Sequence, residues 1–169
     1  ESVKMPLIVR YPGSIKAGTV NEELVSNVDF APTLLEIAGI KADPRMQGRS
    51  IAPLLGGRTP ADWRQAIWYA YGAAGHPHWG MRSKRYKLVL FPGTEDFEFY
   101  DLQKDPREMT NLAGVTDYAA AIAAARKTVE ALKLEVGILP GQLPGKAGWA
   151  RAGAGERKRK KKNRKQESN

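Results

Sequence analysis

Four short aromatic and β-branched runs, each closed by a turn, constrain the second half of this chain most strongly. They occupy residues 66–71, 79–83, 86–91 and 97–102, and glycine, proline or charged residues separate them. Runs of this length and composition are typical of β-strands, and short connections usually join antiparallel neighbours. We therefore predict a small four-stranded antiparallel sheet, with tight turns at residues 83–85 and 92–96.

The segment that follows has a helical period. Apolar side chains recur there at alternating steps of four and three, at Tyr118, Ile122, Ala125, Val129, Leu132 and Val136. This spacing places them in one stripe of an α-helix, with Arg126 and Glu130 four residues apart on the remaining surface. Because a four-stranded sheet with a wet apolar face would be poorly stable, we expect the helix to cover one face of the sheet.

The first part of the chain carries weaker signals for strands and helices. Residues 6–11 are a short apolar run before a Pro-Gly turn, which predicts a buried strand. A short helix is predicted over 30–39, since Asp29 suits an N-cap, proline lies in the first turn and Gly39 ends the segment. Residues 24–28 suit a helical turn or a strand equally.

Glycine and proline punctuate residues 41–62, which is typical of a surface connection. We therefore place a domain boundary near Gly57. Residues 1–57 form the first unit of this prediction, residues 58–136 the second, and residues 137–169 a tail.

Positive charge gathers in this tail. The 169 residues include 27 Lys and Arg against 18 Asp and Glu, and residues 151–169 alone hold nine basic and two acidic side chains. Because glycine and proline recur without apolar periodicity from residue 137 onward, we expect the tail to be disordered. Its basic run favours weak, salt-dependent binding of polyanions, and the lack of interleaved aromatic residues after Trp149 argues against base stacking.

The residue types present exclude several functions. The chain has no cysteine, which excludes disulfides, cysteine-ligated metals and a thiol nucleophile within these residues. It has no apolar run long enough to cross a membrane, no Walker loop and no G-x-S-x-G motif. Residue patterns alone therefore assign no catalytic residue.

The two histidines, His76 and His78, are the main candidates for a binding site. Flanking Pro77, they would supply two metal ligands, but no third ligand is evident nearby. The alternatives are a plain surface loop that ends at Trp79, and a substrate-contacting loop in which imidazoles donate to an anion.

Aromatic and basic residues in the strands leave two further questions open. The dense aromatic side chains of residues 68–100 suit sugar or base stacking, but alternation along strands assigns most of them to a core. Residues 82–87 include four basic side chains: Arg82, Lys84, Arg85 and Lys87. They suit either an anion-binding patch or, as the default, a solvated strand face and turn.

Between Glu1 and about Val136, a series of short segments resembles, in the same order, segments of one known protein family. In the first half they comprise residues 1–13, residues 29–40, Gln47-Gly48-Arg49-Ser50 and Pro53-Leu54-Leu55. In the second half they comprise Trp79-Gly80-Met81-Arg82, Arg85-Tyr86-Lys87-Leu88-Val89, Phe99-Tyr100-Asp101-Leu102, Asp105-Pro106, Glu108 and Asn111-Leu112. By these matches the chain resembles the C-terminal part of a sulfatase.

The resemblance implies an α/β fold of the alkaline-phosphatase type that ends at about residue 57, followed by an α+β subdomain. Members of this family hydrolyse sulfated glycans or aryl sulfates with a formylglycine, made from Cys or Ser in a C/S-x-P/A-x-R motif, beside calcium. Neither the motif nor the family's calcium ligands match anything in these residues. The resemblance therefore implies that this chain supplies scaffold and one wall of the substrate cleft. Catalytic and metal-binding residues would belong to a missing N-terminal catalytic portion.

The resemblance also places His76 and His78 in a loop that reaches toward the substrate in some relatives. They are therefore the predicted substrate-binding residues, acting in ground-state positioning. Two alternatives remain: a non-catalytic polyanion-binding or structural module, and a fragment of a related phosphodiester or phosphonate hydrolase. The family is often exported, but these residues predict no location for this chain.

Overall fold

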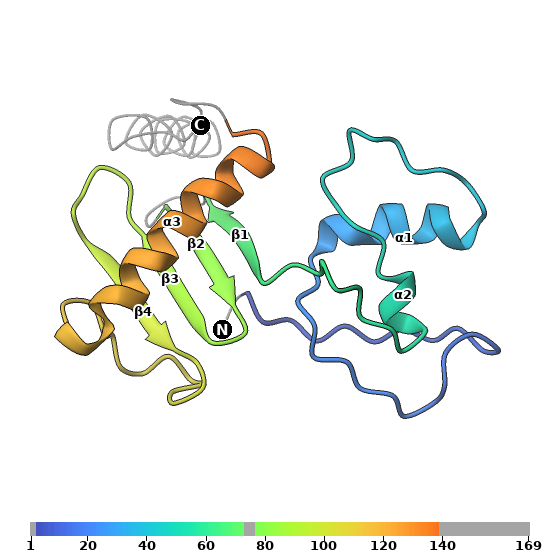
Figure 1. Cartoon of the computed structure of the whole chain (residues 1–169), viewed down its shortest axis with the longest axis horizontal. Coiled ribbons are helices and arrows are strands. Elements are labelled where there is room, and N and C mark those ends of the chain that lie inside the picture. The colour runs from blue at the N-terminus through green and yellow to red at the C-terminus, as the bar shows by residue number, and fades with distance from the viewer. Residues whose placement is uncertain (1–2, 73–76, 139–169) are drawn as a thin grey trace, which may run out of the picture. The chain divides into compact units, whose positions relative to one another are not determined.

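The computed structural model describes residues 3–72 and 77–138, and its chain divides into two compact units (Figure 1). Described residues up to Ile67 form the first unit, and those from Trp68 form the second. The predicted basic tail and His76 lie outside the described residues.

The first unit is built mainly from irregular backbone around three short helical segments. These are η1 (Asn27–Asp29), α1 (Phe30–Ile37) and α2 (Ala52–Leu55). Its buried core consists of Ile51, Leu54 and Trp63. The indole Nε1 of Trp63 donates a hydrogen bond to the carbonyl of Leu24 at 3.1 Å. The expected boundary near Gly57 differs from the observed division because Trp63 belongs to this core.

The helix predicted over 30–39 is present as α1, followed by Gly39 at φ +71°. Asp29 precedes it as expected, but its side chain does not cap α1. The carboxylate instead accepts a hydrogen bond from the backbone N–H of Ser26 at 2.7 Å, at the start of η1. Of the two structures expected for residues 24–28, a helical turn forms at the end of the segment, in η1.

The strand predicted at residues 6–11 is wrong for this chain. These residues are irregular, and Ile8 is 90% exposed. A strand is defined by hydrogen bonds to a neighbouring strand. Residues 6–11 have no such neighbour in the first unit, because no other described residue up to Gln65 belongs to a strand. The turn after this run does form, because Ser14 N–H donates to the carbonyl of Tyr11 at 3.1 Å and Gly13 adopts φ +84°.

The predicted four-stranded sheet forms with order β1-β2-β3-β4, and all of it except the first two residues of β1 belongs to the second unit. Its strands are β1 (Ala66–Tyr71), β2 (His78–Ser83), β3 (Tyr86–Leu90) and β4 (Phe97–Asp101). β2 pairs antiparallel with β3, with Trp79 opposite Leu90. β3 pairs antiparallel with β4, with Leu88 opposite Phe99. The sheet and its predicted strands are confirmed.

The predicted helix is also confirmed: α3 (Ala119–Glu135) follows η2 (Thr116–Tyr118) and lies across one face of the sheet (Figure 1). Ile122, Ala125 and Val129 are its buried residues. Leu88 and Phe99 form the sheet side of this layer, and both are completely buried. No helix among residues 3–72 and 77–138 combines the length and apolar character that a membrane crossing needs.

The opposite face of the sheet carries a second apolar cluster. Val89, Tyr100 and Leu102 are buried there, and Tyr69 and Phe91 pack against them. Side chains alternate between the two faces along each strand, which assigns the aromatic residues of this half to two different environments. The candidate site lies at one end of this second cluster.

Candidate functional site

His78 occupies the first position of β2 and lies among three aromatic rings. Its imidazole stacks on Tyr71, with centroids 5.2 Å apart and planes inclined by 28°. The ring of Tyr69 lies edge-on at 6.2 Å, and that of Phe91 lies at 6.1 Å. We call these four residues the aromatic cluster.

Strand geometry explains how the aromatic cluster forms. Tyr69 and Tyr71 are two residues apart on β1 and so project to the same face of the sheet. The β2–β3 register puts Trp79 opposite Leu90, which places His78 opposite Phe91. Neighbouring strands therefore deliver all four rings to one place.

The members of the aromatic cluster differ in exposure. Tyr69 is partly buried, and its hydroxyl donates a hydrogen bond to the carbonyl of Leu88 at 3.1 Å. Burial raises the pKa of this phenol, so it stays neutral and keeps its hydrogen bond. Tyr71 is half exposed. In the aromatic cluster, the ring of Tyr69 is therefore anchored and partly buried, and the ring of Tyr71 is accessible.

The predicted basic face is largely neutralised by acidic residues. Lys87 is buried and donates to the carboxylate of Glu108, and Arg82 lies 3.5 Å from the same carboxylate. Burial opposes the charge of Glu108, but the hydrogen bond from Lys87 and its charge hold the pKa of this carboxyl below its usual value. Lys87 is thus an exception to the expected solvated face, because it is buried and its amine is paired with Glu108.

Arg85 is engaged by Asp101, a completely buried carboxylate. Its Nη2 donates to Oδ2 of Asp101 at 3.0 Å. This hydrogen bond lowers the pKa of Asp101 against the opposing effect of burial, and the backbone N–H of Gln103 also contributes. Arg82 and Lys87 therefore pair with Glu108 in a largely buried setting, whereas Arg85 pairs with the buried Asp101 from a side chain that is 48% exposed.

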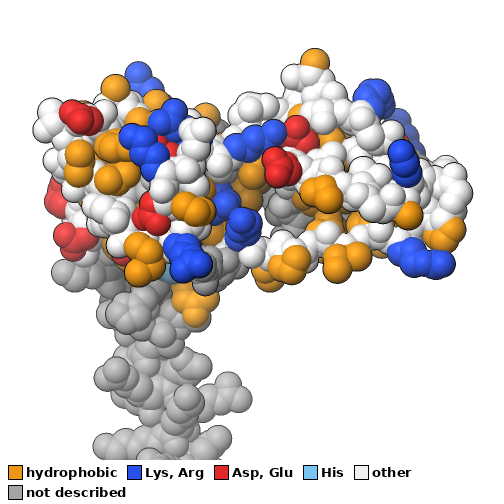
Figure 2. Space-filling model, turned by 90° about the horizontal axis from the view of Figure 1, so that it is seen from below, with side chains coloured by type: hydrophobic (Ala, Val, Ile, Leu, Met, Phe, Trp, Pro, Cys, Tyr) orange, Lys and Arg blue, Asp and Glu red, His pale blue; other side chains and the backbone are white. Residues whose placement is uncertain are grey.

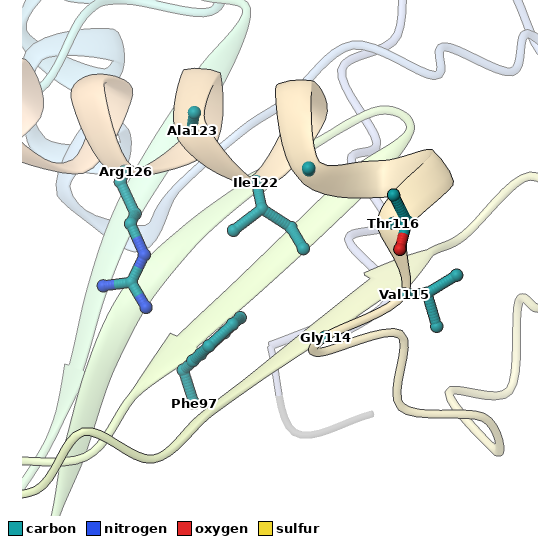
Figure 3. A pocket seen from close by; sticks show the side chains of 8 residues that line it. Phe97, Gly114, Val115, Thr116, Ile122, Ala123 and Arg126 are labelled. Atoms are coloured by element: carbon teal, nitrogen blue, oxygen red, sulfur yellow. The ribbon is translucent and has the colours of Figure 1, made fainter.

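A shallow apolar pocket lies between α3 and β4 (Figure 3). Ile122 and Ala123 form one wall, and Phe97 forms the other. The guanidinium of Arg126 sits 4.4 Å from the centroid of the Phe97 ring. Because its lining contains no acid, histidine or lysine, this pocket lacks the groups that a hydrolytic reaction needs.

The first unit exposes an apolar helix face. Phe30, Leu34 and Ile37 follow helical spacing on α1 and are 42%, 66% and 40% exposed. The buried residues of α1 are Pro32 and Thr33. Figure 2 shows hydrophobic side chains, in orange, at the surface of this unit. We call Phe30, Leu34 and Ile37 the α1 stripe.

Among the sequence candidates, the structure places His78 in the aromatic cluster, and His76 is outside the described residues. No group of three metal-ligating side chains comes together among residues 3–72 and 77–138. From the sequence, Tyr71 was considered only as one of the dense aromatic side chains of residues 68–100, which suit stacking on a ligand or, for most of them, a core. The signal was present, since alternation in Trp68-Tyr69-Ala70-Tyr71 already places both tyrosines on one face.

Comparison with known proteins gives consistent matches over most of the chain. A family model described as N-sulphoglucosamine sulphohydrolase, C-terminal, matches residues 1–135. An N-acetylglucosamine-6-O-sulfatase of Bacteroides thetaiotaomicron is 45% identical over 127 residues, covering 70% of this chain and 23% of that protein. An arylsulfatase of Clostridium perfringens is 30% identical over 129 residues, covering 75% of this chain and 27% of that protein.

Solved structures match in the same way. One, described as a complex with its substrate D-glucosamine-2-N,6-O-disulfate, has a TM-score of 0.78 and 37% identity, covering 83% of this chain and 30% of that one. The phosphonate monoester hydrolase of Agrobacterium radiobacter has a TM-score of 0.62 and 28% identity, covering 73% of this chain and 27% of that one. The chain spans about a quarter of the length of these relatives.

Proposed function

The chain belongs to the family of N-sulphoglucosamine sulphohydrolase C-terminal regions, and we propose that it is the C-terminal part of an enzyme that hydrolyses sulfated amino sugars. The family and its mixed α/β fold agree with the resemblance drawn from the sequence. The 45% identity to an N-acetylglucosamine-6-O-sulfatase supports a 6-sulfated glucosamine as the substrate within the broader class of sulfated glycans and aryl sulfates.

The main structural observation behind this proposal is the exposure of the α1 stripe. A surface helix normally turns its apolar side chains toward a core, whereas Leu34 is 66% exposed here. The chain also corresponds to only about a quarter of its relatives. We propose that upstream polypeptide covers the α1 stripe, so that the first unit completes the catalytic α/β domain.

The nucleophile and the metal would then belong to that upstream polypeptide. The chain contains no cysteine, and none of its serines is followed by x-P/A-x-R, so it offers no residue for a formylglycine. Its described residues likewise offer no cluster of metal ligands. In a complete enzyme a formylglycine beside calcium would supply the group that attacks sulfur. The present residues would supply scaffold and substrate contacts.

His78 and His76 are the substrate contacts that we propose. An imidazole held among aromatic rings can donate a hydrogen bond to a sulfate or carboxylate oxygen and so orient the sugar. In the full-length enzyme, His76→Ala and His78→Ala should each raise KM for the sulfated sugar by about three- to tenfold, with kcat nearly unchanged. Unchanged values of both constants would remove that residue from the substrate contacts.

The overall function can be tested by comparing this chain with the full reading frame that contains it. The full-length protein should release sulfate from N-acetylglucosamine-6-sulfate, and the 169-residue chain alone should not. Turnover by the chain alone at an enzymatic rate, with contaminating activity excluded, would contradict the proposal.

A second candidate is supported by the structural match to a phosphonate monoester hydrolase at 28% identity. The same assay with a phosphonate monoester distinguishes the two functions. Hydrolysis of the phosphonate without hydrolysis of any sulfate ester would favour this second candidate over the first.

A further inference from the structure

Tyr71 is the residue of the aromatic cluster that a ligand can reach. Its side chain is 50% exposed, whereas the ring on which it stacks belongs to the half-buried His78. Of the large hydrophobic side chains exposed in the described part of the second unit, Tyr71 alone is aromatic: the others are Met109, Val115 and Leu134. Among the described residues of this unit, Tyr71 is therefore the one strongly exposed aromatic ring.

The surrounding residues hold that ring in place. Tyr71 lies on β1, and His78, which lies on β2, supports one side of it. His78 in turn contacts the rings of Tyr69 and Phe91, and the hydroxyl of Tyr69 donates a hydrogen bond to the carbonyl of Leu88. A ring fixed by packing on two strands loses little conformational entropy when a ligand stacks on it.

The combination of groups fits a charged sugar. An aromatic face packs against the apolar C–H face of a pyranose ring, and an adjacent imidazole donates to an anionic substituent of that ring. A bare inorganic anion would use only the imidazole. Sites for small ligands commonly pair an apolar wall with a few placed polar groups in this way.

We infer that Tyr71 is a specificity-determining residue, which stacks on the pyranose ring of a sulfated amino sugar while His78 donates to an anionic group on that sugar. This inference rests on the proposed function, because it assigns the substrate contact of the same enzyme. It adds a residue and a mode of recognition that the histidines do not supply.

The test uses the full-length enzyme with Tyr71→Ala, Tyr71→Phe and the matched control Leu134→Ala, which removes an exposed apolar side chain from α3. Four quantities are measured: KM and kcat for N-acetylglucosamine-6-sulfate, the inhibition constant of inorganic sulfate, and the melting temperature. Inorganic sulfate has no ring, so it reports on the anion-binding centre alone.

We expect Tyr71→Ala to raise KM by about three- to tenfold, with kcat and the inhibition constant of sulfate within about twofold of wild type. Tyr71→Phe keeps the aromatic face and should behave as wild type, as should Leu134→Ala. The melting temperature should stay unchanged in all three variants.

Three results would overturn the inference while the wild type remains active. These are an unchanged KM in Tyr71→Ala, an equal loss in Tyr71→Ala and Tyr71→Phe, or parallel changes in KM, the inhibition constant and the melting temperature. The last pattern would identify Tyr71 as a packing contact with other polypeptide. A wild type that hydrolyses no sulfated sugar would instead reject the proposed function and, with it, this inference.

Discussion

Two buried carboxylates organise the two units at the level of single residues. Asp29 is completely buried and accepts two 2.7 Å hydrogen bonds from the guanidinium of Arg64. It also accepts hydrogen bonds from the backbone N–H groups of Ser26 and Arg49. Asp101, also completely buried, holds a corresponding place in the second unit with Arg85. Each carboxylate ties together segments that are distant in the sequence.

Asp29→Asn should destabilise the chain by about 3–5 kcal/mol, because it leaves the largely buried guanidinium of Arg64 without its counter-charge. Urea denaturation measures the change. The matched control is Asp62→Asn, whose carboxylate pairs with Arg49 but is 80% exposed. That pair should contribute less than about 1 kcal/mol. Equal effects of the two substitutions would contradict the central role of Asp29.

Acid should weaken the second unit through Asp101 and Glu108. The pKa values of both carboxyls lie below their ordinary values of 3.8 and 4.5 in the folded protein. The stability they contribute is therefore present above those ordinary values and is lost as the pH falls through the lower, folded values.

We therefore expect the free energy of unfolding to decrease as the pH falls below about 4.5, and further below about 3.8. Urea denaturation across this range measures the slope. The double variant Asp101→Asn, Glu108→Gln should have a shallower slope than wild type. An unchanged slope would show that other groups dominate the acid response.

At the scale of elements, the close approach of β2 and β3 leaves no room for a side chain at Gly80. A Cβ atom added there would lie 1.8 Å from the carbonyl oxygen of Leu88 and 3.1 Å from the hydroxyl of Tyr69. The first contact is with backbone, so the strands would have to separate.

Gly80→Ala should therefore cost about 3 kcal/mol of stability and disturb the aromatic cluster through Tyr69. Gly56→Ala is the control, because its nearest neighbour would be the carbonyl oxygen of Pro53 at an ordinary 3.5 Å. Its effect should stay within about 1 kcal/mol. Thermal unfolding of both variants measures the difference, and a wild-type melting temperature for Gly80→Ala would refute the prediction.

The layer between α3 and the sheet depends on Val129, which is completely buried. Val129→Ala should destabilise by about 2 kcal/mol, since it removes two methyl groups from a packed interface. Leu134→Ala on the same helix removes more atoms, but from a side chain that is 76% exposed. It should change stability by less than about 0.5 kcal/mol, measured by urea denaturation. The reverse order would mean that α3 packs through another face.

At the scale of the whole molecule, one substitution in the α1 stripe should have opposite effects on the isolated chain and on the longer protein that we propose. Leu34→Glu should reduce self-association and binding of a hydrophobic dye by the isolated chain, since it breaks an exposed apolar surface. The same substitution should lower the melting temperature of the full-length protein, because it would bury a charge.

Light scattering, dye fluorescence and thermal unfolding measure these opposite effects. Glu36→Gln, a change of an exposed polar residue on the same helix, should leave all three quantities unchanged. A full-length protein that tolerates Leu34→Glu would show that upstream polypeptide does not cover the α1 stripe.

Local sequence determined the elements of the second unit. Period-two alternation and turn residues were enough to predict β1 to β4, and the four-three spacing was enough to predict α3, because each signal lies within one continuous segment. The α1 helix followed from its proline and terminal glycine for the same reason. Ordered motifs in both halves were also enough to indicate the family.

Tertiary structure decided which residues meet. The strand expected at residues 6–11 does not form, because a strand needs a neighbour that its own residues cannot supply. Arg126 and Glu130 are four residues apart in the sequence, but Glu130 pairs with Lys133 and the guanidinium of Arg126 lies over the ring of Phe97. The burial of Asp29 and the stacking of Tyr71 on His78 bring together residues from separate segments. Such contacts arise only when the chain folds, because their distances depend on strand register and helix packing rather than on spacing along the sequence.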